Sequence, residues 1–261
     1  MTRAILASVL SIILASGCGS EERGTANQNL AYQTRTIDRS VGNCDDTTSG
    51  CAKVRLQCPE FTNAVTAMGR DSLNKTVADW ILARVLESGA ASAPDSVASE
   101  FLRGFSSFEL RFPDSRQRWM IERTVSVLND TLGIATLMYD ELSSTGGAHP
   151  NSSRTYANID LTTGRKLTLA EITKAGAMER LVAVGETEFR RLKQLAANAS
   201  LDQAGFWFTE NRFRLNDNFA IAKRGIIFYY NSYEIAPYAM GPTELLIPYS
   251  KLSGIVSFLR R

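Results

Sequence analysis

His149, the only histidine of this 261-residue chain, is the first residue to consider for chemistry. Imidazole titrates near neutral pH and can act as a general base. Ser152 and Ser153 follow within four residues, but no G-x-S-x-G nucleophile elbow occurs in the sequence. We therefore expect His149 to form a local hydrogen bond. A cell-wall hydrolase that uses His149 and a carboxylate is the alternative.

Three acidic residues near expected turns, Asp160, Glu234 and Glu244, are candidates for a carboxylate pair. A glycosidase needs two carboxyl groups roughly 5 to 9 Å apart in a cleft. Isolated acidic residues near turns more often accept hydrogen bonds from loop backbone. We favour that role for all three, and we expect no catalytic residue in this chain.

The segment from Tyr229 to Pro242 is rich in tyrosine and proline and is the best candidate for a binding surface. Tyrosine gives a large contact area at low entropic cost. A structural lid over a sheet edge is the interpretation that we favour for this loop, and a recognition surface is the alternative. The Gly-Gly pair before His149 could offer backbone amides to an anion, or it could simply allow a tight connection between strands. The candidate binding residues are Gly146, Gly147, His149, Tyr233, Glu234 and Tyr238.

The chain has four cysteines, Cys18, Cys44, Cys51 and Cys58. Cys44 and Cys51 flank the polar stretch DDTTSG, which indicates a hairpin tip that a disulfide would close. We expect a Cys44–Cys51 bond with Cys58 as a buried free thiol, and Cys44–Cys58 is the alternative pairing. The spacing lacks a C-x-x-C pair and His149 is remote, so we expect neither a metal site nor a cofactor.

The first eighteen residues, MTRAILASVLSIILASGC, have the order of a lipoprotein signal peptide. A positive charge at Arg3, an apolar run and small residues precede Cys18. The run is shorter than the roughly 20 residues of a membrane-spanning helix. We expect residues 1–17 to be cleaved, Cys18 to carry the lipid (including palmitate) and residues 18–31 to form a tether. The alternative is an ordinary secretory signal. The expected location is the bacterial cell envelope, on the outer membrane facing the periplasm or cell surface.

Composition excludes one class of partner. The chain has 29 basic and 27 acidic residues, a net charge of +2, so we expect no nucleic-acid binding. The hydrophobic content of 44% is sufficient for a sizeable core.

Clusters of expected strands and helices indicate an α+β fold, with an antiparallel sheet packed against a few helices. A hairpin turning at Asn129-Asp130 and a capping box from Thr168 to Glu171 are expected. Expected helices cover 73–87, a segment opening at Pro94, a short helix from Thr168 and 178–198. Expected strands cover 32–41, 52–58, 119–127, 132–139, 154–161, 206–208, 213–215, 219–222, 226–230 and 244–248.

Two stretches resemble the RsiV-like family, a group of bacterial envelope domains catalogued as a domain of unknown function. They are GGAHPNSSRTYANIDLTTGRKLTLAEI (146–172) and GIIFYYNSYEIAPYAMGPTELLIPYSKL (225–252). The segment CAKVRLQCPEF, followed by Leu73-Asn74, resembles the companion module that precedes this domain in PdaC-type proteins. The resemblance implies a companion module over 32–115 and an RsiV-like domain over 116–261.

One member of that family binds lysozyme through its outer domain. The resemblance therefore implies a non-enzymatic binding or sensing module for an envelope ligand, either a lysozyme-like protein or a peptidoglycan fragment. The expected anchor is the lipid bilayer, through Cys18.

Overall fold

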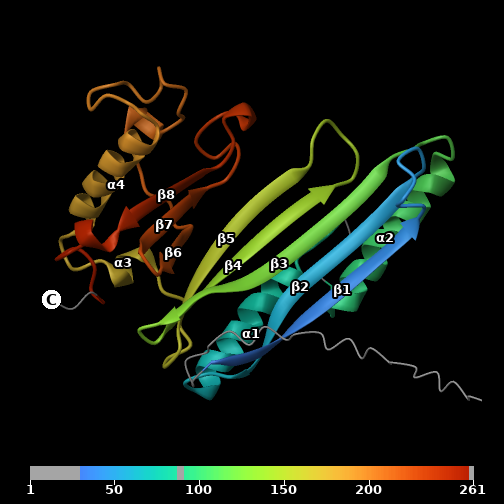
Figure 1. Ribbon diagram of the computed structural model, residues 1–261, viewed down its shortest axis with the longest axis horizontal. Helices are drawn as coiled ribbons and strands as arrows, with labels where there is room; N and C mark the ends of the chain where they lie inside the picture. The colour runs from blue at the N-terminus through green and yellow to red at the C-terminus, as the bar shows by residue number, and fades with distance from the viewer. Residues whose placement is uncertain (1–29, 87–90, 259–261) are drawn as a thin grey trace, which may run out of the picture.

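The computed structural model describes residues 30–86 and 91–258, so the leader, Cys18 and most of the expected tether lie outside the described residues. The fold is α+β, as predicted, with a five-stranded sheet and a separate three-stranded sheet (Figure 1). The elements of the larger sheet and its helices are β1 (Ala31–Gly42), β2 (Cys51–Asn63), α1 (Ala67–Ile81), α2 (Pro94–Arg111), β3 (Arg118–Thr131), β4 (Ile134–Ser144) and β5 (Asn151–Asp160). The C-terminal unit contains α3 (Leu169–Ile172), α4 (Met178–Leu192), η1 (Thr209–Asn211), β6 (Phe219–Ala222), β7 (Gly225–Tyr230), η2 (Tyr238–Met240), β8 (Thr243–Pro248) and η3 (Tyr249–Lys251). No helix in the described ranges is both long enough and apolar enough to cross a membrane.

The larger sheet has the order β1-β2-β3-β4-β5, and one of its pairings differs from the antiparallel expectation. Strands β2 and β3 run parallel, whereas the other neighbours are antiparallel. A parallel pair needs a long crossover, and α1 and α2 supply it between β2 and β3. The sheet therefore joins the stretches 32–115 and 116–261 through direct strand pairing.

Helices α1 and α2 pack on one face of this sheet (Figure 1). Along β2, Val54 and Leu56 are buried against them while Lys53 and Arg55 are exposed. This alternation has the period of two that a half-covered strand requires. We call the side of the sheet that carries Lys53 and Arg55 the open face.

The boundaries of α1 differ from the expected 73–87. The helix begins after Thr66, whose hydroxyl accepts a hydrogen bond from the Gly69 amide at 3.0 Å, and it ends at Ile81. A Cβ atom at Gly69 would lie 2.3 Å from the Leu161 carbonyl oxygen, so glycine allows this close approach to the end of β5. Helix α2 begins at Pro94, as predicted, after the N-cap residue Ala93.

The turn between β3 and β4 lies three residues beyond the predicted Asn129-Asp130. Leu132 and Gly133 have φ values of 59° and 73°, as a two-residue hairpin turn requires. Asn129 is instead buried beside an irregularity in the β3–β4 register. The predicted turn position was wrong because the bulge extends β3 past the polar pair.

The C-terminal unit has its own core, built around phenylalanine. Phe189 of α4 packs against three rings at centroid distances of 5.0 to 5.5 Å, those of Phe206, Phe208 and Phe213. The segments 206–208 and 213–215 are not strands, contrary to the prediction. Their backbone forms local turns, such as the Phe206 amide to Leu201 oxygen bond of 2.9 Å, while their rings are buried.

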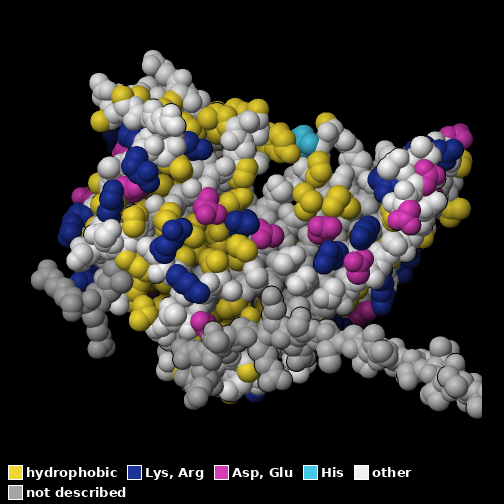
Figure 2. All heavy atoms as spheres, viewed as in Figure 1, with side chains coloured by type: hydrophobic (Ala, Val, Ile, Leu, Met, Phe, Trp, Pro, Cys, Tyr) yellow, Lys and Arg dark blue, Asp and Glu magenta, His cyan; other side chains and the backbone are white. Residues whose placement is uncertain are grey.

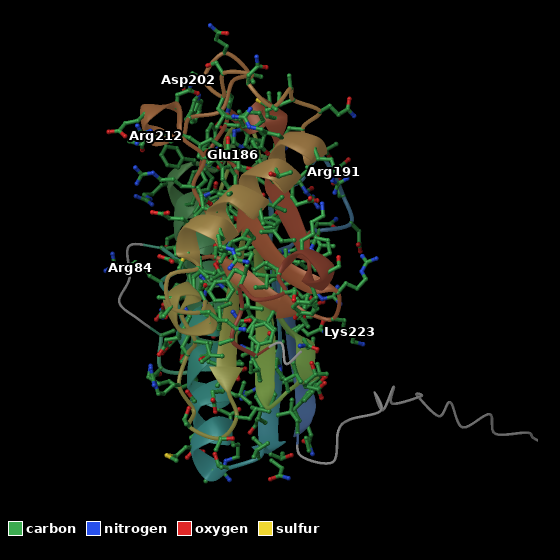
Figure 3. All side chains as sticks on the ribbon, turned by 90° about the vertical axis from the view of Figure 1, so that its left-hand side faces the viewer. Arg84, Glu186, Arg191, Asp202, Arg212 and Lys223 are labelled. Atoms are coloured by element: carbon green, nitrogen blue, oxygen red, sulfur yellow. A yellow bond between two sulfur atoms is a disulfide. The ribbon has the colours of Figure 1, made fainter. Side chains whose placement is uncertain are left out.

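Helix α4 ends at Leu192 rather than near Asn198, because Gln194 adopts a φ of 56°. Its buried Glu188 pairs with Lys251 of η3 and, at 3.0 Å, with Arg191. Burial would raise the pKa of Glu188, but the hydrogen bonds from Lys251 and Arg191 lower it below its ordinary value. The Arg191 side chain lies on the outside of the C-terminal unit (Figure 3).

Candidate functional site

Asparagine side chains attach the C-terminal unit to β5, the edge strand of the larger sheet. The Asn231 Oδ1 accepts from the Arg154 amide at 2.7 Å, and the Asn218 Oδ1 accepts from the Tyr156 amide at 2.9 Å. The Asn218 Nδ2 also donates to the Arg154 carbonyl oxygen at 2.8 Å. These bonds satisfy the outward groups of an edge strand that would otherwise be open to pairing.

A buried contact continues this attachment toward the start of β4. The Asn158 Oδ1 accepts from the Ile221 amide at 2.8 Å, and its Nδ2 donates to the Phe219 carbonyl at 2.9 Å. The hydroxyl of Thr136 lies 2.9 Å from the same Asn158 oxygen. Buried polar networks that are fully paired hold a single arrangement. These bonds therefore fix the position of the loops of the smaller sheet relative to those of the larger sheet.

An aromatic edge forms where the β4–β5 loop meets the β7–β8 loop. The His149 ring stacks on the Tyr238 ring with centroids 3.9 Å apart and an angle of 15°. Tyr233 is on the same β7–β8 loop as Tyr238, and the centroids of their rings are 5.5 Å apart with an angle of 32° between the ring planes. Hydrophobic side chains gather along the upper edge of the C-terminal unit beside the histidine (Figure 2). We call His149, Tyr233 and Tyr238 the aromatic edge.

Tyr233 is held in a conformation that a bulky side chain rarely adopts. Its φ is 67°, and 55% of the residue is exposed. Left-handed backbone at a non-glycine residue costs on the order of 1–3 kcal/mol and occurs most often at functional sites. The protein thus presents an exposed tyrosine to solvent from a strained stretch of backbone.

Two further exposed residues extend this surface and were missed from the sequence. Trp207 is 54% exposed and its amide bonds the Ile235 carbonyl at 2.8 Å, two residues after Tyr233. Met240 is 42% exposed and lies at the end of η2, which begins at Tyr238. A tryptophan inside a polar, irregular segment was the available sequence signal for Trp207.

Glu234, a predicted binding residue, holds its own loop instead of joining the aromatic edge. Its Oε2 accepts from the Asn231 amide at 2.8 Å and its Oε1 accepts from the Asn216 Nδ2 at 2.6 Å. These two bonds brace the turn in which Tyr233 has its positive φ. Glu234 therefore supports the position of Tyr233.

The three carboxylates considered as a catalytic pair have separate partners. Asp160 accepts from the amides of Thr162 and Thr163 at 2.8 Å each, as a turn cap. Glu244 pairs with Arg154 at 3.2 Å. The loop-acceptor role that we favoured describes Asp160 and Glu234, whereas Glu244 takes part in an ion pair.

His149 itself lacks an acid–base partner within residues 30–86 and 91–258. Its Nδ1 lies 3.1 Å from the Pro150 carbonyl oxygen, and no hydrogen bond joins it to a serine or carboxylate of that range. Gly146 has a φ of 95°, and a Cβ there would lie 2.5 Å from the Gln117 amide oxygen, so a neighbouring side chain occupies the space beside it. Gly147, with a φ of 117°, faces open space. The glycine pair thus serves the loop that carries His149.

Arg154 is at the centre of an ionic cluster on the open face. Its Nε donates to Asp140 at 2.7 Å, and its guanidinium lies 5.0 Å from the centre of the Tyr229 ring. Burial would lower the pKa of Arg154, but the hydrogen bond and charge of Asp140 raise it above its ordinary value. A shallow cavity of about 220 Å³ adjoins this cluster, lined by Glu122, Thr124, Asp140, Glu141, Leu142, Ser152, Ser153 and Tyr229.

A second cleft, of about 320 Å³, opens on the helix-covered side below the His149 loop. It is lined by Arg84, Val85, Leu86, Phe101, Ile121, Arg123, Glu141, Ser143, Ser144, Thr145, Gly146, His149 and Asn151. Arg84 lies at its rim, on the surface of the molecule (Figure 3). Because His149 belongs to both features, this cleft adjoins the aromatic edge.

The cleft contains a buried ion pair. Arg123 is 1% exposed; its Nε donates to Glu141 Oε2 at 2.8 Å and its guanidinium reaches the carbonyls of Ile81, Ala83 and Arg84 at 2.7 to 3.2 Å. It thereby bonds the carbonyl of Ile81, the last residue of α1, where a cation is favoured, and two carbonyls of the segment that follows the helix. Tyr139 donates to the same Glu141 oxygen at 2.5 Å, and burial raises its pKa well above the ordinary value.

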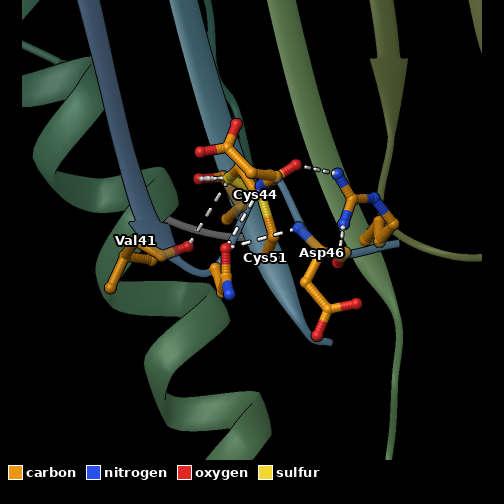
Figure 4. The surroundings of a disulfide bond; sticks show 8 residues. Val41, Cys44, Asp46 and Cys51 are labelled. Atoms are coloured by element: carbon orange, nitrogen blue, oxygen red, sulfur yellow. Dashed lines mark hydrogen bonds between the residues drawn. A yellow bond between two sulfur atoms is a disulfide. The ribbon is translucent and has the colours of Figure 1, made fainter. Parts of the chain in front are cut away.

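The disulfide closes the β1–β2 hairpin, at the same end of the strands as the His149 loop. Cys44 and Cys51 are bonded, with Cα atoms 5.1 Å apart, and Arg118 holds the loop through the carbonyls of Cys44 and Asp46 (Figure 4). Hydrogen bonds from Ser49 and Thr48 lower the pKa of Asp46 to about 2. Cys58 is a buried free cysteine, as predicted. The described residues contain no group of three or more His, Cys, Asp or Glu side chains placed to hold a metal ion.

The fold and these features define an α+β protein in which a helix-backed sheet carries a smaller C-terminal β unit. Residues 170–250 match the family described as "Protein of unknown function (DUF3298)", which agrees with the predicted RsiV-like resemblance in this part of the chain. Disulfides persist in oxidising compartments, so the Cys44–Cys51 bond supports a location outside the cytoplasm.

Two solved structures share the fold. A member of the DUF3298 family from Bacteroides fragilis matches with a TM-score of 0.69 and 22% identity, over 87% of this chain and 94% of that chain. A DUF3298 family protein from Pseudomonas aeruginosa matches with a TM-score of 0.60 and 20% identity, over 87% and 95% of the two chains. At these identities the likeness concerns the fold alone.

Curated relatives match a shorter part of the chain. Immunogenic protein MPB64 of Mycobacterium bovis and immunogenic protein MPT64 of Mycobacterium tuberculosis are each 26% identical over 118 residues. The alignment covers 43% of this chain and 47% of each relative, so it spans about half the length of these proteins.

Proposed function

We propose that this chain is a non-enzymatic binding module for a glycan-containing ligand of the bacterial envelope, of the peptidoglycan-fragment class. The observation that carries the proposal is Tyr233, a 55% exposed residue with a left-handed backbone whose ring lies beside the stacked pair of Tyr238 and His149. Exposed aromatic surface of this kind marks interaction sites on otherwise polar proteins. Flat rings suit the apolar faces of sugar rings.

The rigid attachment of the two loops supports this proposal. Asn218 and Asn231 fix the C-terminal unit on β5, so the aromatic edge is formed before any ligand arrives. A preorganised surface loses less conformational entropy on binding. The same rigidity favours recognition over a large induced closure.

A lysozyme-like protein is the other partner that we expected from the sequence. With a net charge of +2, the chain provides no strong negative field to steer a basic protein. We therefore favour the glycan and treat lysozyme as a second outcome of the same test. For a hydrolase, His149 would need an acid–base partner, and no described residue supplies one.

The test is retention of the full-length chain, kept soluble in detergent, on insoluble peptidoglycan and on immobilised lysozyme. We expect retention on peptidoglycan that falls at least tenfold in Tyr233→Ala. Tyr32→Ala is the matched control, because Tyr32 is also exposed, at 45%, but lies on β1. Retention on lysozyme alone, or no retention on either at micromolar concentration, would refute the proposal. Release of soluble fragments from the peptidoglycan would favour the hydrolase.

We further propose that the chain is a lipoprotein anchored through Cys18 and that residues 32–115 are the companion module of PdaC-type proteins. The extracytoplasmic disulfide supports export. Cys18→Ser is expected to move the protein from the membrane fraction to the soluble fraction. Persistent membrane association of that variant would contradict the lipid anchor.

A further inference from the structure

We propose that the cleft below the His149 loop binds one N-acetylated amino-sugar unit, with Glu141 as its polar anchor. This inference rests on the proposed function and specifies the part of the glycan that is recognised. Its starting point is Glu141, which lines the cleft together with His149 of the aromatic edge. A sugar chain lying on that edge would place a neighbouring unit near the cleft.

The two carboxylate oxygens of Glu141 differ in their hydrogen bonds. Its Oε2 accepts from Arg123 at 2.8 Å and from Tyr139 at 2.5 Å, which fixes the carboxylate. Among the residues that the structure describes, none donates a hydrogen bond to its Oε1. The side chain is 25% exposed and belongs to the lining of the cleft.

The charges that line the cleft disfavour a cationic ligand. Arg123 balances Glu141 at close range, and Arg84 at the rim adds a positive charge that disfavours ammonium groups. A carboxylate held in this way accepts hydrogen bonds, and bonds to a charged acceptor are about twice as strong as neutral ones. A hydroxyl or amide N–H of a neutral ligand satisfies these conditions.

The rest of the lining supplies both halves of an amphipathic ligand. Ser143, Ser144 and Thr145 line the cleft at the end of β4, and serine and threonine hydroxyls can donate or accept. The apolar lining consists of Val85, Leu86, Phe101 and Ile121, of which Phe101 and Ile121 are almost fully buried. A sugar that carries hydroxyls and an acetamido methyl group presents both chemistries at once.

The cleft volume limits the ligand to a small unit. At about 320 Å³ it lies at the lower end of the roughly 300–1,000 Å³ of typical ligand sites. It therefore takes one ring, and the remaining units of a chain lie outside it along the aromatic edge. Specificity for the acetyl group is expected to come from Val85 and Leu86, the two apolar lining residues that are only half-buried.

The experiment is calorimetric titration of the full-length chain in detergent with the trimer of N-acetylglucosamine and with its de-acetylated trimer. We expect binding of the acetylated trimer and at least tenfold weaker binding of the de-acetylated one. Val85→Trp, which fills the cleft, is expected to weaken binding at least tenfold. The control is Ser152→Val, which lies on the other cavity and is expected to bind as the wild type does.

Glu141→Gln is the second variant, with an expected loss of at least fivefold. Glu141→Gln leaves the buried Arg123 without its counter-ion, so the fold of this variant is checked by circular dichroism. If Glu141→Gln does not fold, the result for Val85→Trp decides. Unchanged trimer binding in a folded Val85→Trp protein would overturn the inference. If the Val85→Trp protein is still retained on peptidoglycan and only Tyr233→Ala is not, the proposed function stands and the assignment of the cleft is refuted. If the wild-type protein is not retained on peptidoglycan, both the proposed function and the assignment of the cleft are refuted.

Discussion

The larger sheet carries an arginine–carboxylate pair on each face, and the two pairs differ in their surroundings. Arg123 and Glu141 are cross-strand neighbours on the side covered by α1 and α2, with the two side chains 2% and 25% exposed. Arg154 and Asp140 are cross-strand neighbours on the open face, with side chains 27% and 37% exposed. Glu141 and Asp140 are adjacent on β4, so the strand pleat alone sends them to opposite faces.

The difference shows how adjacent residues of one strand can stabilise two different parts of the molecule. The covered pair holds the end of α1 and the segment after it, because the Arg123 guanidinium bonds the carbonyls of Ile81, Ala83 and Arg84. The open pair links two sheets, because Arg154 of β5 also contacts Glu244 of β8 and the Tyr229 ring of β7. We therefore expect the covered pair to determine global stability and the open pair to determine how firmly the C-terminal unit is attached.

Replacement of Arg123 tests this comparison with the largest expected effect. Arg123→Leu removes the counter-ion of Glu141 and the donor to three carbonyls, and breaking a buried pair costs about 3–5 kcal/mol. The loss is measured as the free energy of unfolding in urea. The matched control is Arg55→Leu on the open face of β2, expected to change stability by about 0.5 kcal/mol or less. Similar losses in the two variants would refute the structural role of Arg123.

Replacement of Arg154 is expected to have a smaller and more local effect. Arg154→Leu removes the bonds to Asp140 and Glu244. Hydrogen bonds to buried charged groups contribute about 1.5–3 kcal/mol, and we expect a smaller loss of unfolding free energy here because these side chains are partly exposed. Hydrogen exchange should quicken in β6, β7 and β8 before it changes in β3 and β4. Uniform quickening across both sheets would mean that the open pair stabilises the whole fold in the same way as the covered pair.

The sequence predicted the elements that local chemistry determines. The Cys44–Cys51 hairpin tip, the helix opening at Pro94 and the Thr168–Glu171 capping box are all present. Each depends on residues within a few positions of one another. Of the candidate site, His149, Tyr233 and Tyr238 do come together.

Features that depend on distant partners could not be predicted in this way. The parallel β2–β3 pair and the asparagine contacts to β5 join residues at least sixty positions apart. Arg123 offered a usable signal, because it interrupts the apolar alternation of Ile121 and Val125 and therefore lies on the covered face. A charge at such a position requires a buried partner, which is Glu141.

Alkaline titration compares tyrosines near the two pairs. Burial raises the pKa of both Tyr139 on the covered face and Tyr229 next to the open pair, and Tyr139 also donates to Glu141. A tyrosine with a raised pKa in the folded state contributes stability that is complete below its unfolded value of 10.0 and is lost as the pH rises above it.

We therefore expect the free energy of unfolding to fall as the pH rises above 10, and to fall less steeply in Tyr139→Phe. The lost bond to Glu141 should also cost this variant about 1 kcal/mol at neutral pH. Tyr229→Phe is the control and is expected to show a smaller change on both counts. Identical pH profiles in the wild type and Tyr139→Phe would show that the covered tyrosine does not contribute to the alkaline loss.

The smallest expected effect concerns Glu244, the outer partner of the open pair. Its side chain is 48% exposed and lies 3.2 Å from Arg154, while Asp140 retains the closer contact at 2.7 Å. Exposed pairs contribute about 0.2–1 kcal/mol and are screened by salt. Glu244→Gln is expected to lie at the low end of that range at low ionic strength, and the difference from wild type should vanish in about 1 M salt, where the Debye length is about 3 Å. A larger loss that persists in high salt would show that Glu244 is part of a desolvated network, and the contrast between the two faces of the sheet would then be one of degree only.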